Sequence, residues 1–302
     1  MGRVHVRTYE GIPGVRVAAI YSRNLSNALS LAEGLRCKGT DNADDLLDDP
    51  DIQVLDICLP SPLHKEFAVR GALKGKHIIL EKPIALEEAD GREILAACRS
   101  AGVQLLVGHI VRFLPVYRRV KRVLEEGEFG KPAIVRTTRV GRIPDSQETW
   151  YSDPRQTGGL LVDLLIHDFD CLCWWFGPVR TVFAREFPHS AHATLRFRNK
   201  VIAHVQGNWT HAASWAKWEI CGPGGLLQYD GRTSSVLTVY EEGKMVQESP
   251  VTLSPFEREL AHFLDCVNGK ASPLVTGEEA LYALRVALAC RESSASRKPV
   301  EL

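Results

Sequence analysis

The sequence predicts an α/β protein of two domains: a Rossmann-type domain with a parallel sheet, then an α+β domain with a largely antiparallel sheet. The chain has 302 residues, which is longer than one ordinary domain. Up to residue 112, buried β-branched strands alternate with helices, a pattern typical of a parallel sheet covered on both faces. From residue 113 on, strands of alternating polarity favour an antiparallel sheet.

In the first domain, residues 1–112, strands and helices follow one another with short connections. A first helix closes at Gly14, where Pro13 bars its continuation. Short apolar runs predict strands at 15–22, 52–60, 77–83 and 103–109. Helical patterns lie between them, at 27–36, 43–51, 64–76 and 87–102, the last stopped by Gly102. This order predicts βαβ units, because parallel strands need crossover connections.

The second domain, residues 113–302, begins with an amphipathic helix at 115–130 and a half-exposed strand at 133–142. A long apolar helix is expected over 158–177. Period-two patterns bounded by Gly, Asn and Pro predict further strands at 193–199, 201–209, 215–223, 225–231 and 235–242. Helices at 256–269 and 277–296 finish the chain, and the segment 276–296 is a candidate to join the first domain.

Charge and cysteine content exclude several classes of function. Lys+Arg and Asp+Glu are both 37, so the formal net charge is zero, which favours neither a nucleic-acid nor a membrane partner. We find no signal peptide and no long uninterrupted apolar span. The eight cysteines are scattered without a C-x-x-C motif, so we expect reduced thiols, a cytoplasmic protein and no metal site.

Buried ionisable residues interrupt the apolar helix at 158–177. Asp163 and His167 are four residues apart and Asp170 is three further on, so a continuous helix would place them along one face. Burying these groups is costly unless they pair or face a polar cavity. A catalytic pair and a structural pair explain the pattern equally well, whereas Asp168 is expected to be structural.

A second candidate site follows two of the predicted parallel strands. In open α/β sheets, ligands bind beyond the carboxyl ends of the strands. Lys82 leaves the strand at 77–83 just before a proline, and Ser61 and His64 follow the strand at 52–60. These side chains are placed to reach a cofactor. A solvated lysine, and a turn with a helix cap at Ser61, are the structural alternatives.

These motifs together resemble the glucose–fructose oxidoreductase / inositol dehydrogenase / rhizopine-catabolism (Gfo/Idh/MocA) oxidoreductase family. The resemblance runs nearly end to end. It rests on "CLPSPLH", "GKHIILEKP", "VGHIVRF", "TGGLLVDLLIHDFD", "EICGPGG" and "LYALRVALACRESSASRKPV". The EKP element, followed after a Gly-rich turn by D-x-x-x-H, is its most specific part.

The resemblance implies an oxidoreductase that moves a hydride between nicotinamide and a hydroxyl-bearing carbon of a sugar, inositol or related polyol. It makes Lys82 the active-site lysine and Asp163 and His167 the paired acidic and imidazole positions. Alcohol oxidation needs a base for the hydroxyl proton, and histidine suits that role near neutral pH. We expect His167 to be the acid/base and Asp163 to position lysine and substrate. Lys82 then polarises the oxygen or shares the proton relay.

The cofactor is expected to be NAD or NADP. NAD sites usually carry an acidic residue after the second strand, but Ser22 and Arg23 stand there, which favours NADP. A solvated arginine is the alternative, and Asn24 is placed to reach the ribose. By resemblance, the nicotinamide side is lined by Pro60, Ser61, His64, Glu81, Lys82, His109 and Arg112.

The beginning of the chain departs from the family pattern. Members begin with a strand that runs into G-x-G-x-x-G, and Gly2 fits only the last glycine of that turn. The helix N-terminus at Gly2 would then meet the dinucleotide pyrophosphate. We expect Met1 to be an internal methionine of a longer natural protein.

Further expectations concern substrate, assembly and rival functions. Trp150 and Tyr151, together with Asp153, resemble a loop that borders the substrate pocket. Trp209, Trp215 and Trp218 mark either a homodimer or homotetramer surface on the antiparallel sheet or simply the core. Rival functions are reduction of a non-sugar carbonyl or imine, and a catalytically silent dinucleotide sensor.

Overall fold

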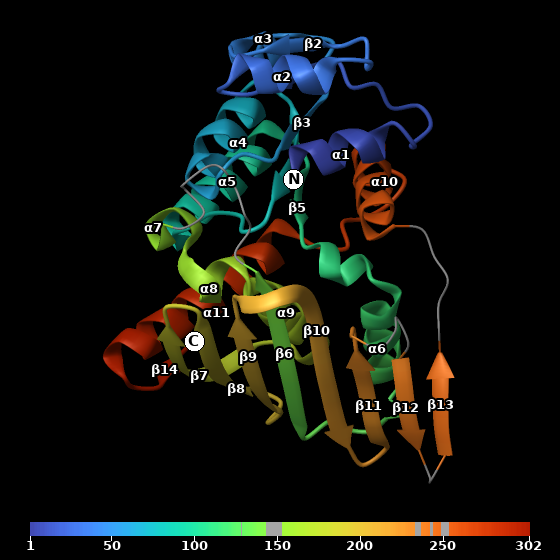
Figure 1. Ribbon diagram of the computed structural model, residues 1–302, viewed down its shortest axis with the longest axis vertical. Coiled ribbons are helices and arrows are strands. Elements are labelled where there is room, and N and C mark those ends of the chain that lie inside the picture. The colour runs from blue at the N-terminus through green and yellow to red at the C-terminus, as the bar shows by residue number, and fades with distance from the viewer. Residues whose placement is uncertain (128, 143–152, 233–236, 242–243, 249–253) are drawn as a thin grey trace. The chain divides into compact units, whose positions relative to one another are not determined.

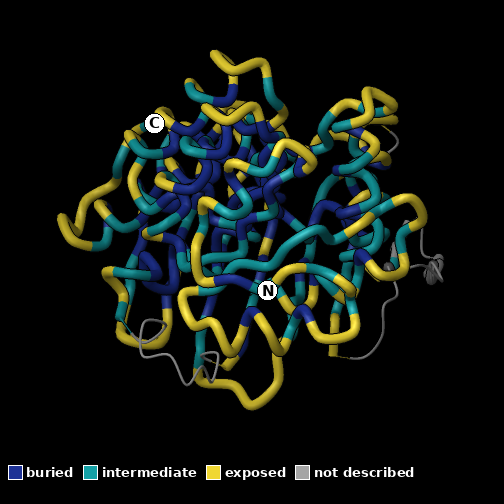
Figure 2. Tube along the Cα trace, turned by 90° about the horizontal axis from the view of Figure 1, so that it is seen from above, coloured by how far each residue is buried: buried dark blue, intermediate teal, exposed yellow. Residues whose placement is uncertain are grey.

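The computed structural model describes residues 1–127, 129–142, 153–232, 237–241, 244–248 and 254–302 (Figure 1). The chain divides into two compact units. Unit 1 comprises residues 1–110 and 253–278, and unit 2 comprises 111–252 and 279–302. The segment that returns to unit 1 is therefore 253–278, whereas the sequence pointed to 276–296. Buried residues, dark blue in Figure 2, lie inside and exposed ones, yellow, mostly in loops outside.

Unit 1 carries five short parallel strands among its described residues, in two separate sheets. The first sheet pairs β1 (Ala19–Tyr21) with β2 (Lys38–Thr40). The second has the order β3-β4-β5, formed by Val54–Ile57, His77–Glu81 and Leu105–Gly108. The Rossmann-type prediction is confirmed, although β2 was not expected.

Helices cover these strands as the βαβ pattern requires. They are α1 (Gly2–Tyr9), α2 (Leu25–Ala32), α3 (Asp44–Leu47), α4 (His64–Leu73), α5 (Glu88–Ala101) and α10 (Pro255–Val267), with the short 3-10 helix η1 (Ser61–Leu63) before α4. Gly102 ends α5 in the left-handed conformation, with φ of 68°. Gly71 lets α4 approach the sheet, because a Cβ there would lie 2.8 Å from the Ile78 side chain.

Unit 2 is built on a sheet whose described strands have the order β13-β12-β11-β10-β6-β9-β8-β7-β14 (Figure 1). Every neighbouring pair is antiparallel except β6 with β9, so the predicted largely antiparallel sheet is confirmed. The strands are β6 (Ile134–Arg142), β7 (Val179–Phe187), β8 (Ser190–Phe197), β9 (Ile202–Asn208), β10 (Thr210–Gly222), β11 (Gly225–Asp230), β12 (Leu237–Glu241), β13 (Lys244–Glu248) and β14 (Val300–Glu301).

The helices of unit 2 include α6 (Pro115–Glu126), α7 (Pro154–Thr157), α8 (Gly159–Asp163) and α9 (Ile166–Phe176), after the 3-10 helix η2 (Ile110–Phe113), which begins at the unit boundary. The last helix, α11 (Gly277–Ser296), begins in unit 1 and continues into unit 2. An aromatic cluster forms part of the core. Trp218, 1% exposed, stacks on Tyr229 and meets Tyr117 and Trp175 edge-on. Trp218 is thus a core residue.

The single apolar helix expected over 158–177 is wrong, because the chain breaks between α8 and α9. At the break, the Leu165 N–H donates to the Leu160 carbonyl, five residues back, at 3.0 Å. Such a wide turn displaces the regular helical ladder and bends the chain. Asp163 therefore ends one helix and His167 lies in the next. Their four-residue spacing is not that of a continuous helix.

Candidate active site

In unit 1, three neighbouring strands end at one edge of their sheet. Strand register pairs Ile57 with Leu80 and Glu81 with Gly108. Lys82 directly follows β4, His109 directly follows β5, and Pro60 and Ser61 follow β3. The sequence-predicted residues of unit 1 at these positions thus leave the same carboxyl edge, where open α/β sheets bind ligands.

His64 joins the loops that follow β3 and β4. Its side chain is 1% exposed, with Nε2 2.9 Å from the Leu59 carbonyl and Nδ1 2.8 Å from the Pro83 carbonyl. Burial lowers the pKa of His64, and the nearby Lys82 ammonium acts in the same direction. The buried ring lies between the two loops, and a neutral imidazole donates its single N–H to one of the two carbonyls. Its contact with a cofactor stays a prediction.

Glu81 and Lys82 are linked at the end of β4. The Lys82 N–H donates to Glu81 Oε2 at 3.1 Å, and the Glu81 side chain is buried. His5 Nε2, from α1, lies 3.2 Å from the other carboxyl oxygen of Glu81. Sequence reasoning missed His5, because only the fold brings α1 to this edge.

The predicted dinucleotide end of unit 1 has the donors that a phosphate needs. Helix α1 begins at Gly2, and in the described residues no side chain caps its first turn, so backbone N–H groups there suit an anion. Arg23, just beyond β1, is exposed, and Asn24 Oδ1 accepts the Ser26 N–H at 3.0 Å as the cap of α2. The Ser22 N–H donates to the Thr40 carbonyl at 3.0 Å. The contacts of these groups with a dinucleotide stay a prediction.

In unit 2, Asp163 is the last residue of α8 and His167 the second of α9, and both are half-buried. The two other acidic residues of this region form ion pairs. Asp168 Oδ2 accepts from Arg139 Nε at 2.5 Å, which confirms its expected structural role. Asp170 pairs with Arg112, a predicted cofactor residue that is 1% exposed. Arg112 therefore has a structural partner within unit 2, and its cofactor contact stays a prediction.

The predicted substrate residues Trp150 and Tyr151 lie outside the described residues. Asp153, next to them, caps α7 by accepting the Arg155 N–H at 3.0 Å. Hydrogen bonds from Arg155 lower the pKa of Asp153 to about 2. Asp153 thus has a local structural role at the end of this loop.

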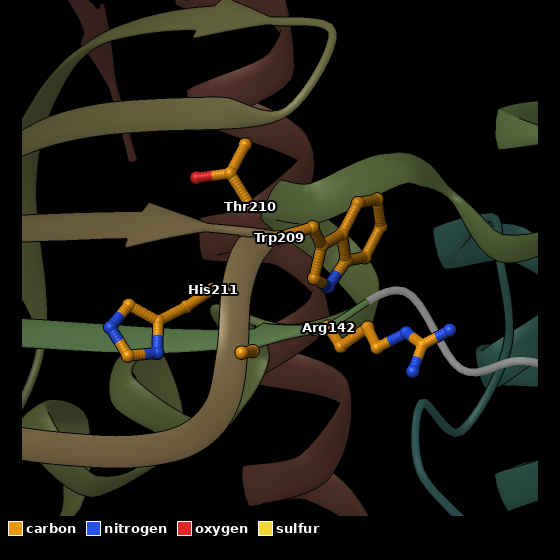
Figure 3. A pocket seen from close by; sticks show the side chains of 5 residues that line it. Arg142, Trp209, Thr210 and His211 are labelled. Atoms are coloured by element: carbon orange, nitrogen blue, oxygen red, sulfur yellow. The ribbon is translucent and has the colours of Figure 1, made fainter.

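A hollow of about 320 Å³ lies where β6 ends and β9 turns into β10 (Figure 3). It is lined by Arg142, Trp209, Thr210, His211 and Ala212. Of these five residues, the sequence patterns marked only Trp209, as part of an assembly surface or of the core.

All eight cysteines are free thiols. Across the described part of the chain, no helix combines the length and apolarity that a membrane crossing requires.

Comparisons with known proteins cover both units. The model of an "Oxidoreductase family, NAD-binding Rossmann fold" matches residues 1–109, and that of the "Oxidoreductase family, C-terminal alpha/beta domain" matches 121–302. The chain is 27% identical to 1,5-anhydro-D-fructose reductase of Ensifer adhaerens, over 88% of this chain and 84% of the relative. It is 26% identical to myo-inositol 2-dehydrogenase of Thermotoga maritima, over 100% and 96%.

Among solved structures, levoglucosan dehydrogenase in complex with NADH and levoglucosan has the same fold, with a TM-score of 0.91, 21% identity and coverage of 100% of this chain and 96% of that one. The sequence motifs, the carboxyl-edge arrangement of unit 1 and the two matched family models agree. The chain belongs to the Gfo/Idh/MocA family of NAD(P)-dependent oxidoreductases.

Proposed function

We propose that the chain transfers a hydride between a nicotinamide and the hydroxyl-bearing carbon of a sugar, an inositol or a related polyol, with Lys82, Asp163 and His167 as its catalytic residues. Family membership over residues 1–109 and 121–302 supports this activity. The names of the similar inositol and levoglucosan dehydrogenases support the substrate class. The nicotinamide, when bound, supplies the hydride acceptor or donor.

The three side chains divide the proton chemistry. His167 takes the proton of the reacting hydroxyl, because an imidazole exchanges protons near neutral pH. Lys82 polarises the same oxygen through its ammonium, and Asp163 orients the lysine and the substrate. Trp150 and Tyr151 border the substrate and set its identity.

The position of Lys82 is the observation that carries this proposal. It follows β4 directly, at the edge where β3, β4 and β5 all end. Its backbone is held by Glu81, and the Pro83 carbonyl that follows it is held by His64. A lysine fixed in this way reaches a reacting group with less loss of conformational entropy than one on a free loop.

We further propose that the cofactor lies against α1 and β1, with NADP preferred. Gly2 faces the pyrophosphate, and Ser22, Arg23 and Asn24 face the ribose. An exposed guanidinium attracts a 2′-phosphate, whereas the carboxylate usual in NAD sites would repel it. Pro60, Ser61, His64, Glu81, Lys82 and His109 would line the nicotinamide side.

Absorbance at 340 nm tests the activity directly. The purified chain is mixed with NAD⁺ or NADP⁺ and with myo-inositol, scyllo-inositol, glucose or levoglucosan. We expect reduction of the dinucleotide with at least one of these polyols, and loss of it in Lys82→Ala. Dinucleotide binding without turnover in either direction would instead identify a silent sensor.

Reduction of a carbonyl is the second candidate direction, favoured by the similarity to 1,5-anhydro-D-fructose reductase. The same assay run with NADPH or NADH separates the two directions. Oxidation of the reduced dinucleotide by 1,5-anhydro-D-fructose, with no reduction of the oxidised form by the polyols, would identify a reductase. Reductive amination substrates test the imine alternative.

We propose that the chain is a cytoplasmic homodimer or homotetramer, assembled through the sheet of unit 2. Ile134 and Ile202 are paired on neighbouring strands and are both exposed, and Phe187 of β7 is 62% exposed. Apolar groups of this kind on a sheet face favour association. Light scattering of wild type and Ile202→Lys tests it. A monomeric wild type would contradict the proposal.

A further inference from the structure

Unit 1 contains a cluster of ionisable side chains that come from four elements. His5 comes from α1, Asp56 from β3, Glu81 from β4 and Glu259 from α10. His5 is 2% exposed, Glu81 8% and Glu259 0%. Burying this many ionisable groups costs free energy unless they satisfy one another, so their arrangement needs an explanation.

His5 is the centre of the cluster, because its two ring nitrogens face two different carboxyl groups. Nδ1 lies 2.8 Å from Asp56 Oδ2, and Nε2 lies 3.2 Å from Glu81 Oε1. Tyr9, one turn along α1, donates its hydroxyl to the same Asp56 oxygen at 2.8 Å. Cys58 Sγ lies 3.4 Å from Nδ1. His5 thus bridges the ends of β3 and β4.

The charges around His5 favour its doubly protonated form. Burial lowers the pKa of His5, but the Asp56 carboxylate and the hydrogen bonds to Asp56, Cys58 and Glu81 outweigh it and raise the pKa well above 6.5. His5, Asp56 and Cys58 also offer atoms within 4.8 Å of one another that could hold a metal ion. Here the two ring nitrogens of His5 face Asp56 at 2.8 Å and Glu81 at 3.2 Å, and this is the arrangement of an ionic bridge.

The bridge continues to Lys82. Glu81 uses Oε1 toward His5 and Oε2 to accept the Lys82 N–H at 3.1 Å. Gly108 stands beside this carboxyl group, where an added Cβ would lie 3.5 Å from Oε1. One carboxyl group therefore connects helix α1 to the backbone of the lysine loop.

We infer that His5 is a positioning residue: through Glu81 it sets the backbone of Lys82 and ties it to the helix whose N-terminus receives the dinucleotide. This inference rests on the proposed function for the role of Lys82. His5 lies one turn from Gly2, so a shift of α1 is transmitted through one ion-pair contact, to Glu81, and one hydrogen bond, to the Lys82 N–H, to the start of the lysine loop. Cofactor binding and lysine placement share one ionic link.

Two matched substitutions test the two contacts of His5 separately: the Glu81 arm, from Nε2 to Glu81, and the Asp56 arm, from Nδ1 to Asp56. The amide nitrogen of glutamine can take the place of His5 Nε2, and that of asparagine the place of Nδ1. His5→Gln therefore keeps a donor toward Glu81, whereas His5→Asn keeps one toward Asp56. Tyr9→Phe is the control, because it removes a hydrogen bond to Asp56 and leaves the Glu81 arm intact.

Hydrogen exchange of the Lys82 amide is the first readout, since it needs no substrate. We expect His5→Asn to speed this exchange about tenfold relative to His5→Gln, because only His5→Gln keeps a donor toward Glu81, and Tyr9→Phe to leave it within about threefold of wild type. Equal exchange in all four proteins would overturn the inference, as would equal acceleration in both His5 variants. Glu81→Gln weakens the same link from its other end and replaces His5→Asn if that variant does not fold.

Steady-state kinetics with NADP⁺ and myo-inositol is the second readout. We expect kcat to fall about tenfold in His5→Asn, with the KM of myo-inositol changed less than about threefold, and to recover in His5→Gln. If wild type transfers no hydride to either dinucleotide, the proposed function is wrong. The hydrogen exchange of the Lys82 amide still tests whether His5 acts on Lys82 through Glu81. If wild type is active and His5→Asn matches it in both readouts, only the link fails.

Discussion

Arg112 and Asp170 form a two-point ion pair in which both side chains are 1% exposed. Arg112 Nε donates to Oδ2 at 2.9 Å and Nη2 donates to Oδ1 at 2.7 Å. Glu279 approaches the same guanidinium, with 3.1 Å between Nη1 and Oε1, and the guanidinium lies over the Trp174 ring. The pair ties η2 to α9 within unit 2.

Asp170→Ala is expected to destabilise unit 2 by about 3 kcal/mol, because it removes the carboxylate that pairs with the buried guanidinium at two of its nitrogens. Arg112→Met combined with Asp170→Leu should recover much of this loss. Tryptophan fluorescence during urea unfolding measures it, since all six tryptophans lie in the segment 111–252. A single variant within about 0.5 kcal/mol of wild type would argue that the pair adds little.

The raised pKa of His5 predicts how the stability of unit 1 depends on pH. The folded state keeps a proton that the unfolded state loses above the ordinary pKa of 6.5. The stabilisation is therefore fully present below pH 6.5 and declines as pH rises, by about 1.4 kcal/mol per pH unit. His5→Gln cannot titrate, so its stability deficit against wild type should shrink between pH 6.5 and pH 8.5. Exchange of the β4 amides measures it, and a deficit that grows with pH would contradict this charge assignment.

Glu259 predicts a stabilising substitution. Burial, and then the Glu81 carboxylate, hold the pKa of Glu259 well above 4.5, so folding favours its protonated form. Neither carboxyl oxygen of Glu259 has a hydrogen-bond partner among the described residues. Glu259→Gln removes the cost of keeping this proton, and unit 1 should become more stable than wild type at pH 8. The gain should increase with pH. Calorimetry at pH 6 and pH 8 checks it, and lower stability at both would refute the expectation.

Arg23 tests the cofactor preference. Arg23→Asp replaces an exposed cation beyond β1 with a carboxylate of the kind that binds a ribose hydroxyl. We expect the Kd of NADPH to rise at least about tenfold, while that of NADH falls or stays unchanged. Fluorescence titration of both dinucleotides measures these values. Equal weakening of NADH and NADPH would mean that Arg23 does not read the 2′-phosphate.

Sequence patterns predicted several strands and helix ends whose signals lie close to them in the sequence. Apolar runs located β3, β4 and β5, and the glycine at 102 located the end of α5, because such signals lie within a few residues of the feature they specify. The three-residue strand β2 was not predicted, because three residues are too few to show a period-two pattern. The break after Asp163 was not predicted either, because a continuous apolar stretch carries no local signal that divides it into two helices.

The position of Lys82 directly after β4 was predictable, because a family motif marks it. The cluster around His5 was not, because His5 and Asp56 are 51 residues apart and meet only when α1 packs on β3. A lone histidine in an amphipathic helix carries no local signal of its partners. His64 shows a related limit: its motif pointed to a cofactor contact, which stays a prediction, and gave no sign that its ring nitrogens lie 2.8 and 2.9 Å from two backbone carbonyls.

The hydride-transfer rates of wild type, Lys82→Ala, His167→Ala and the double variant test the central claim most directly. If both side chains act on one hydroxyl group, each single variant should lose about 10²- to 10⁴-fold in kcat. The kcat of the double variant should then be only slightly lower than that of the less active single variant. Wild-type turnover in either single variant, or losses that multiply in the double variant, would contradict a shared reaction centre.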